Sequence, residues 1–406
     1  MNGISMAERA LLDHAAQAPM LAQVQNWAAV NSGSRNLDGL AVMAGLLADA
    51  FAILPGPVTL VDAGPVDAVA PDGSLIQVAH GRHLHLTVRP EAPFQLLLTG
   101  HMDTVFPVDH PFQQQRWLDT GMLNGPGVAD MKGGLAVMLA ALAAMEGTEA
   151  AGRFGYEVVI NSDEEVGSPS SAALIRTASG GKAAALTYEP ALPDGMLAGA
   201  RAGSGNFSII VTGRSAHAGR NPEDGRNALL AAADLALRLK AGSGGGFSCN
   251  PARIDGGAPN NVVPDHAVLR VNFRPRAPQD ERAARALLDR AMTDVARHHD
   301  VALRLHGGFG RPPKPMDASA LRLFGLVRDC GACLNIPVMW RDTGGVCDGN
   351  IIAACGVPVV DTMGVRGGAI HSDAEYMLVD SLSERARLSA LVLARLVRDH
   401  GGEDGI

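Results

Sequence analysis

The chain has 406 residues, of which 47% are hydrophobic, and its formal net charge is −8. This length exceeds what one hydrophobic core usually serves, so the composition favours a globular protein with two domains. The acidic balance and the lack of a Lys/Arg run argue against partners such as nucleic acid or an anionic membrane, because both need a clustered basic surface. The expected ligand is a small molecule.

The cysteines and the first residues of the chain favour a cytoplasmic protein. Five cysteines at irregular spacing do not resemble a disulfide framework. The pair Cys330-Gly-Ala-Cys333 could be half of a zinc knuckle, but no second pair follows, and the segment is predicted as the end of a helix. Met1–Gln25 contains acidic residues and no apolar signal region, so we expect an opening helix there. The longest apolar stretch, Gly134–Met145, is too short to span a bilayer.

Strands and helices alternate through the first half of the chain. The predicted elements are strands at Gln95–Thr99, Tyr156–Asn161 and Ala183–Tyr188 and helices at Lys132–Met145 and Ser170–Thr177. This alternation is typical of an α/β domain with a mostly parallel sheet and helices on both faces, in which sites form at the carboxyl ends of the strands. We therefore expect the chemistry at that edge of the sheet.

The order of elements changes after residue 202. The pattern predicts strand, helix, strand, strand, helix and strand, in turn at Asn206–Thr212, Asn227–Lys240, Asn250–Asp255, His266–Arg274, Gln279–His298 and Val301–His306. This β-α-β-β-α-β order is that of a ferredoxin-like unit. We therefore predict an inserted α+β domain over residues 203–313.

The α/β pattern resumes after Pro312-Pro-Lys-Pro315. It predicts a helix from Ala318, a strand at Val357–Thr362 and a closing helix over Ser381–Asp399. The catalytic domain is therefore predicted to consist of residues 1–202 and 314–406, interrupted by the inserted domain.

Acidic residues and histidines follow several of the predicted strands and could form a centre for two metal ions. Such a centre needs a ligand that bridges cations about 3.5–4 Å apart, further ligands for each cation, and a free acid or base. We predict Asp130 as the bridge, because a short carboxylate in a Gly-rich loop before a helix is held rigidly with both oxygens available. His101 and Glu189 would bind one cation, and Glu165 and His371 the other.

Two acidic residues remain beside these ligands. Asp103 is predicted to bind the second ring nitrogen of His101 and so to fix its tautomer. Glu164 is adjacent to a ligand without being one, and we predict it as the general base. Glu164 and Glu165 could instead be a solvated surface pair, but they follow the apolar run Tyr156–Ile160 and therefore leave a buried strand.

A series of motifs extends over nearly the whole chain: Gly100-His-Met-Asp-Thr, Gly127-Val-Ala-Asp-Met-Lys-Gly-Gly, Asp163-Glu-Glu-Val-Gly, Arg214-Ser-Ala-His217-Ala-Gly, Gly257-Ala-Pro-Asn-Asn261-Val-Val-Pro, Thr343-Gly-Gly-Val-Cys-Asp348 and His371-Ser-Asp-Ala-Glu375. In this order they resemble the di-zinc metallopeptidase family that contains glutamate carboxypeptidases, aminoacylases, acetylornithine deacetylase and succinyl-diaminopimelate desuccinylase. The amino-acid sequences of the motifs most resemble those of the glutamate carboxypeptidases.

The resemblance implies two Zn²⁺ per chain, although nitrogen and oxygen ligands without a thiolate could also hold Mn²⁺ or Co²⁺. It implies that Glu164 deprotonates a water that bridges the metals, and that this water attacks an amide carbonyl. Glu164 would then pass the proton to the leaving amine, so its pKa should be raised. A cis peptide between Asp130 and Met131 is also implied.

The resemblance also makes the inserted domain a lid and dimerisation domain. His217 matches a lid histidine that reaches across a homodimer interface to the oxyanion of the reaction. Asn261 is implied to help bind substrate, and Arg274 and Arg311 to grip a substrate carboxylate. From the residues alone, His217 or Asn261 could instead serve a turn, and the arginines could form surface ion pairs. Cys347 stands where relatives usually carry Ser or Thr, and a packed small residue is favoured there over a nucleophile.

The expected function is hydrolysis of the amide bond of an N-acyl amino acid or small peptide with a free carboxylate, as in a carboxypeptidase. A deacylase of N-acetyl or N-succinyl amino acids is the alternative, and it shares all the metal ligands. A non-catalytic ligand-binding homologue is a third hypothesis, but neither a metal ligand nor the base is missing from this sequence.

Overall fold

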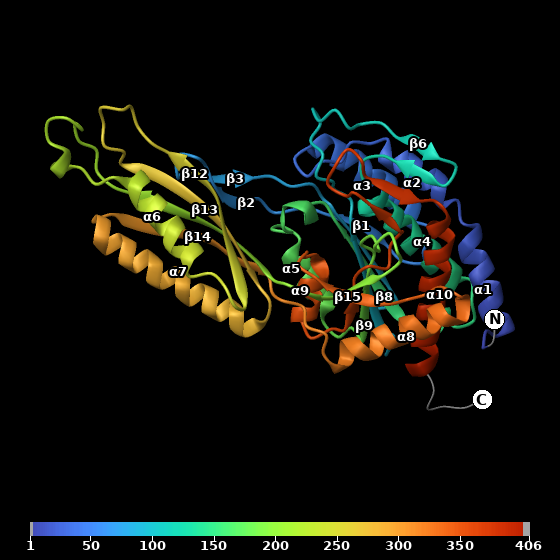
Figure 1. Ribbon diagram of the computed structural model, residues 1–406. Helices are drawn as coiled ribbons and strands as arrows, with labels where there is room; N and C mark the ends of the chain where they lie inside the picture. Colours follow the sequence, from blue (N-terminus) through green and yellow to red (C-terminus); the bar gives the residue numbers. More distant parts are fainter. Residues whose placement is uncertain (1–2, 401–406) are drawn as a thin grey trace.

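A computed structural model describes residues 3–400 of the chain, which form two bodies (Figure 1). The larger body is built on a six-stranded sheet with the strand order β1 (Val58–Val61), β4 (His83–Val88), β8 (Gly155–Asn161), β5 (Gln95–His101), β9 (Ala184–Thr187) and β16 (Val359–Val360). Strands β8, β5, β9 and β16 run parallel, and β4 runs against its neighbours β1 and β8. The predicted mostly parallel sheet is confirmed.

Helices cover both faces of this sheet, as predicted. One face packs on α1 (Met6–Gln17), α2 (Met20–Ala28), α3 (Leu37–Phe51), α4 (Gly133–Glu146), α8 (Ala318–Leu334) and α10 (Asp380–His400). Side chains on the other face pack on α5 (Ala172–Ser179) and α9 (Asp348–Ala354). Strands covered on both sides are apolar throughout, which explains the unbroken apolar run in β5.

Two details of the helices differ from the predictions. The opening segment is two helices rather than one, because the chain turns at Ala18 and Pro19, where proline cannot continue a helix. The segment Val128–Glu146 is long and apolar enough to cross a membrane, but 94% of it is buried inside the protein. A helix that is apolar on all sides is expected at such a buried position, so α4 is a core helix.

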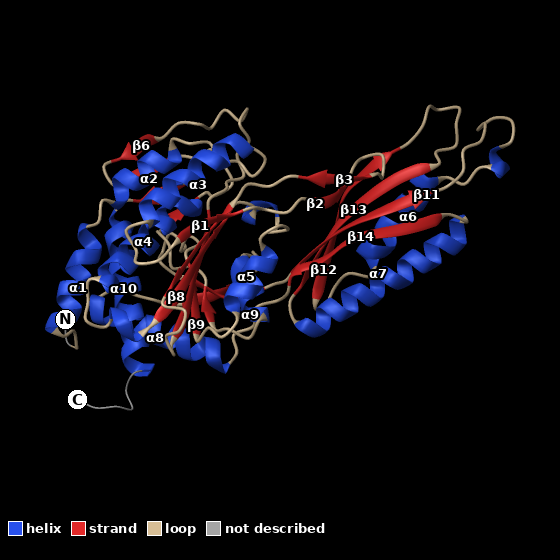
Figure 2. Ribbon diagram, turned by 180° about the vertical axis from the view of Figure 1, so that it is seen from behind, coloured by secondary structure: helices blue, strands red, loops and turns tan. Residues whose placement is uncertain are grey.

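The smaller body, residues 204–311, is called the lid below. Its antiparallel sheet has the order β12 (Phe247–Gly256), β13 (His266–Pro275), β11 (Ser204–Thr212) and β14 (Ala302–Arg311). Helices α6 (Ala228–Ala241) and α7 (Pro278–His299) cover one face (Figure 2). The two segments that connect the bodies pair with each other, because the backbone N–H groups of Arg201 and Lys314 each donate to the other residue's carbonyl, at 2.9 and 3.0 Å.

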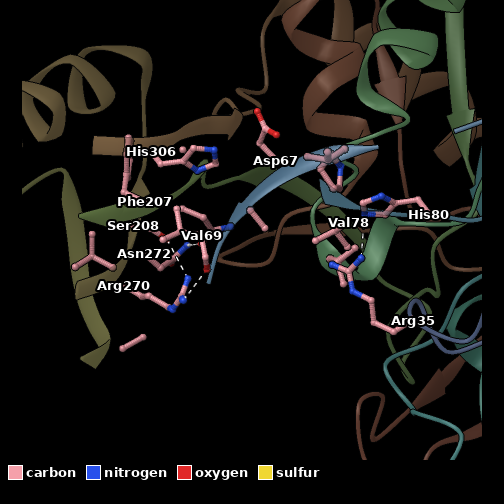
Figure 3. A pocket seen from close by; sticks show the side chains of 18 residues that line it. Arg35, Asp67, Val69, Val78, His80, Phe207, Ser208, Arg270, Asn272 and His306 are labelled. Atoms are coloured by element: carbon pink, nitrogen blue, oxygen red, sulfur yellow. Dashed lines mark hydrogen bonds between the residues drawn. The ribbon is translucent and has the colours of Figure 1, made fainter. Parts of the chain in front are cut away.

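A hairpin that the sequence did not predict lies between the two bodies. Its strands are β2 (Val66–Val69) and β3 (Leu75–Val78), and it packs on the lid face opposite α6 and α7 (Figures 1 and 2). Arg270 Nη2 donates to the Val69 carbonyl at 2.8 Å, and Arg304 Nη2 donates to the Gly73 carbonyl at 3.3 Å. A cavity of about 440 Å³ lies between this hairpin, the polar face of the lid sheet and the loop after Glu165 (Figure 3).

Candidate active site

Parallel strands bring three of the predicted site segments to one edge of the sheet. His101 ends β5, and its register partner Asn161 ends β8, three residues before Glu164. Glu189 follows β9, the other neighbour of β5. The carboxyl ends of adjacent parallel strands meet at one edge, so these side chains converge as the sequence predicted.

Asp130 and His371 reach the same edge from other segments. Asp130 lies in the turn that precedes α4, and His371 lies in a loop with a positive φ of 64°. At the start of α4, Gly134 packs so closely on Tyr188 that a Cβ atom would clash with the Tyr188 carbonyl oxygen. A glycine there is therefore needed to bring the Asp130 turn beside the Glu189 loop. The peptide Asp130-Met131 is cis, as the resemblance implied.

Asp130 stands between the two histidines. Its Oδ1 is 3.1 Å from His101 Nε2, and its Oδ2 is 3.3 Å from His371 Nε2. Glu189 Oε2 lies 3.7 Å from the same nitrogen of His101, and Glu165 Oε2 lies 3.2 Å from the same nitrogen of His371. Each oxygen of Asp130 therefore faces one half of a five-residue donor set, which is the arrangement predicted for a bridging carboxylate.

The electrostatics of this donor set fit two divalent cations. Hydrogen bonds with Asp130 and Glu165 raise the pKa of His371 to about 11, while burial and Asp130 raise the pKa of Glu165 to about 7. Burial opposes protonation of His101, but Glu189 and hydrogen bonds to neighbouring carboxylates raise its pKa well above the usual value. Crowded carboxylates thus hold protons on both imidazoles, and cations would replace these protons.

Glu164 lies beside this donor set, and a carboxylate oxygen of Glu164 is within 4.8 Å of the donor atoms of His101 and Glu189. Arg311 sets it apart from the other acids, because Arg311 Nη2 lies 2.7 Å from Glu164 Oε1. Burial raises the pKa of Glu164 well above the usual value, although Arg311 opposes the shift. A buried carboxyl group with a raised pKa beside metal ligands has the properties of a general base.

Asp103 does more than the sequence predicted. Its Oδ1 is 3.4 Å from His101 Nδ1, although that nitrogen is closer to the backbone oxygen of Asp103, at 3.0 Å. The carboxylate also accepts hydrogen bonds from the backbone N–H groups of Glu164, at 3.1 Å, and Glu165, at 3.2 Å. Ser34 Oγ donates to it at 2.7 Å. Asp103 therefore orients both the histidine and the turn that carries the two glutamates.

Glu375 supports the site in a role that the sequence did not predict. Its buried carboxylate accepts hydrogen bonds from the backbone N–H groups of Gly127, Ala129 and Asp130 at 3.0–3.1 Å. Burial, with a contribution from Asp130, raises the pKa of Glu375 to about 7. The only signal in the sequence was an acid four residues after His371 within one motif.

We expect Glu375→Gln to weaken metal binding by about 10- to 100-fold, as is typical when a residue that supports a metal ligand is changed. Glutamine replaces one acceptor oxygen with an NH₂ group, so the loop carrying Asp130 loses part of its support. Competition with a chromophoric chelator measures the change, and Glu149→Gln, on the exposed surface, is the matched control. Unchanged metal affinity would contradict the supporting role.

Of the four predicted lid residues, only Arg311 reaches the predicted metal-ligand set of the same chain. His217 and Asn261 lie together, since the Ala218 N–H donates to the Asn261 carbonyl at 2.9 Å. They are in loops at the ends of β11 and β12 that point away from the larger body (Figure 1). Arg274 lines a separate cavity of about 530 Å³, and its Nε donates to Asn272 Oδ1 at 2.8 Å. Their contacts with substrate stay predictions.

Arg311 also has partners within the chain. Its Nη2 donates to Ser168 Oγ at 2.8 Å, to the Glu164 backbone carbonyl at 2.8 Å and to Asp348 Oδ1 at 3.3 Å. Because Arg311 is buried among these groups, it holds Glu164 in place in this structure, and its grip on a substrate carboxylate stays a prediction.

A cavity of about 350 Å³ opens onto the metal-ligand set. Four of the predicted ligands line it together with Glu164, Arg201, Arg341 and Cys347. Cys347 is buried, and its Sγ donates to Asp361 Oδ2 at 3.5 Å. Burial raises the pKa of this thiol well above the usual value, which favours the packed residue over a nucleophile.

Residues 97–395 of the chain match Peptidase family M20/M25/M40. The chain belongs to this family. It is a hydrolase of the metallopeptidase class that acts on amide or peptide bonds and has a dinuclear metal site. The recognition from sequence motifs is therefore confirmed.

Two curated members of the family are similar to the chain. Carboxypeptidase G2 of Pseudomonas sp. (strain RS-16) is 30% identical over 319 residues, which cover 75% of this chain and 74% of that protein. Succinyl-diaminopimelate desuccinylase of Xanthomonas oryzae pv. oryzae is 30% identical over 328 residues, which cover 74% and 84%. Aminopeptidase PepT from Bacillus cereus shares the fold, with a TM-score of 0.69, 22% identity and 93% and 98% coverage.

Proposed function

We propose that this M20 enzyme hydrolyses the amide bond that joins an acyl group to an amino acid or small peptide with a free carboxylate, in the manner of a carboxypeptidase. The observation that supports it best is the placement of Asp130, whose two oxygens each face one half of the donor set beside a buried Glu164. Similarity to carboxypeptidase G2 supports the carboxypeptidase type.

The residues of the chain divide the chemistry between them. Two divalent cations, when bound, supply the positive charge that polarises an amide carbonyl and lowers the pKa of water. Glu164 takes a proton from the attacking water on its carboxylate and later gives it to the leaving amine. Burial raises the pKa of Glu164 well above its usual value, which makes its carboxylate a stronger proton acceptor. Asp103 holds Glu164 in place through the backbone N–H group of that residue.

A hydrolysis screen of N-acyl amino acids tests this function. Acyl group and amino acid are varied one at a time, with Zn²⁺, Mn²⁺ or Co²⁺ supplied. We expect aromatic acyl-glutamates and acyl-aspartates to be cleaved faster than their N-acetyl and N-succinyl counterparts. Preference for N-succinyl or N-acetyl substrates would instead support the deacylase, which the similarity to the desuccinylase favours as second candidate. No hydrolysis of any of them would overturn the proposal.

We further propose that the enzyme acts as a cytoplasmic homodimer in which His217 serves the partner's site. His217 belongs to the loop after β11, and this loop points away from the larger body, which supports a contribution in trans (Figure 1). The absence of disulfides among the described residues, where all five cysteines are free, agrees with a reducing compartment.

Subunit exchange checks the contribution in trans. His217→Ala and Asp130→Ala are each expected to be inactive alone, because one lacks the oxyanion contact and the other lacks the bridging ligand. After mixing and exchange, about a quarter of wild-type activity should return, since half of the chains form heterodimers and each has one complete site. Activity that stays at the level of the separate variants, in heterodimers verified by mass spectrometry, would contradict it.

A further inference from the structure

The cavity beside the metal ligands contains two arginines among its described lining residues, Arg201 and Arg341. Arg201 is buried and already paired with Asp361: its Nε lies 2.7 Å from Oδ2 and its Nη2 lies 3.2 Å from Oδ1. Its Nη1 donates to the Gly345 carbonyl at 3.3 Å. All three nitrogens of Arg201 are therefore engaged within the protein.

Arg341 is placed differently. It belongs to β15 (Trp340–Thr343), which pairs in parallel with β10 (Leu197–Arg201) and sets Arg341 opposite Ala198. The preceding Trp340 packs on Phe324, with ring centroids 5.2 Å apart, against the core of the larger body. Successive side chains of a strand point to opposite sides, so Arg341 points away from that core, where the cavity lies and where Ala198 leaves room.

The guanidinium of Arg341 is available to a ligand. Its ion pair is with Asp194, at 3.8 Å between Nη1 and Oδ2, and the two side chains are 57% and 49% exposed. Exposed pairs at this distance contribute little, so a ligand carboxylate can displace Asp194 at small cost. The neighbouring Asp342 also lines the cavity, and its Oδ1 accepts a hydrogen bond from the Ala200 N–H at 3.0 Å.

We infer that Arg341 binds a free carboxylate of the substrate and so selects anionic N-acyl amino acids. This inference rests on the proposed function. A guanidinium fork suits a carboxylate, and a cavity of about 350 Å³ has the size of a small-molecule site. Arg341 shares this cavity with Asp130 and Glu165, whereas Arg274 lines another cavity and Arg311 is held by Glu164.

The carboxylate recognised by Arg341 can belong to either half of the substrate. In a carboxypeptidase it is the α-carboxylate of the released amino acid, and in a desuccinylase it is the distal carboxylate of the acyl group. Two substrate pairs distinguish these sources: an N-acyl-glutamate with its α-carboxamide, and an N-succinyl amino acid with its N-butyryl analogue.

The test compares Arg341→Ala, Arg341→Lys and the control Arg322→Ala, an exposed arginine outside the cavity. We expect one of the two pairs to respond. For the compound of that pair that carries the carboxylate, Arg341→Ala should raise KM by about 10- to 100-fold with kcat little changed, since a charged hydrogen bond is lost. The uncharged member of that pair should change less than about twofold, and Arg341→Lys should recover part of the loss. Arg274→Ala is run beside them.

Binding is measured separately from turnover by calorimetric titration of the metal-loaded Glu164→Gln variant, with and without Arg341→Ala, using the same compounds. A carboxylate-specific loss of affinity supports the inference even if the wild-type enzyme cleaves none of them, which would overturn only the proposed function. Equal effects on charged and uncharged compounds, or no effect of Arg341→Ala, would overturn the inference about Arg341. So would a carboxylate-specific loss that appears with Arg274→Ala alone.

Discussion

Glu164→Gln is expected to lower kcat by about 100- to 10,000-fold while both metal ions stay bound. Glutamine keeps the shape of the side chain beside Arg311, whose Nη2 lies 2.7 Å from Glu164 Oε1, but it cannot take a proton from water. The bridging carboxylate and the histidines are untouched, so the change isolates proton transfer.

The measurement combines steady-state kinetics on the best substrate of the screen with metal analysis of the same preparation. Glu91→Gln, on an exposed position of the larger body, is the control and should be as active as the wild type. Turnover near the wild-type rate in a fully metallated Glu164→Gln enzyme would remove Glu164 from the role of base. Loss of metal from this variant would instead indicate that Glu164 is a ligand, which its place among the donor atoms permits.

Asp130→Ala is expected to lose both metal ions and with them all measurable hydrolysis. One oxygen of Asp130 faces His101 and the other faces His371, so the change removes a ligand from each half of the set. Metal analysis should show about two ions in the wild type and fewer than one in the variant. Two retained ions would contradict the bridging role.

The same site predicts how metal affinity depends on pH. In the metal-free chain the pKa of His371 is raised to about 11 and that of Glu165 to about 7, so at neutral pH the first is protonated and the second partly so. Ligands must lose these protons to bind, and affinity should therefore rise from pH 6 to pH 8. Zinc titrations at both pH values, with proton release followed in buffers of different ionisation enthalpy, check this. Equal affinities would contradict the protonation of these ligands.

The sequence was sufficient to predict the central strands, the inserted domain and the convergence of the predicted metal ligands at one edge of the sheet. Strands β5 and β8 are long apolar runs that end in acids or histidine, so their direction and the place of their site residues follow from pattern alone. The order of the motifs along the chain then indicated that Asp130 and His371 belong to the same site as the residues that follow β5 and β8.

One missed feature, the hairpin, is local, and the other two depend on partners far apart in the chain. The strands of the hairpin are four residues each, and only Val69 among them is buried, so they have no clear apolar period. The role of Glu375 rests on a contact with Asp130 across 245 residues. The availability of Arg341 depends on which other arginines already have partners, and a sequence without coordinates does not state this.

The β2–β3 hairpin has a consequence for how fast the enzyme can work. The hairpin contacts Ile210 of β11. This residue is six positions after Ser204, where the chain enters the lid, and hence about 20 Å from that point. If the lid rotates about the two segments that connect the bodies, the hydrogen bonds of Arg270 and Arg304 to the hairpin must break, or the hairpin must move with the lid. Substitutions in the hairpin are therefore expected to change turnover without altering any predicted metal ligand or Glu164.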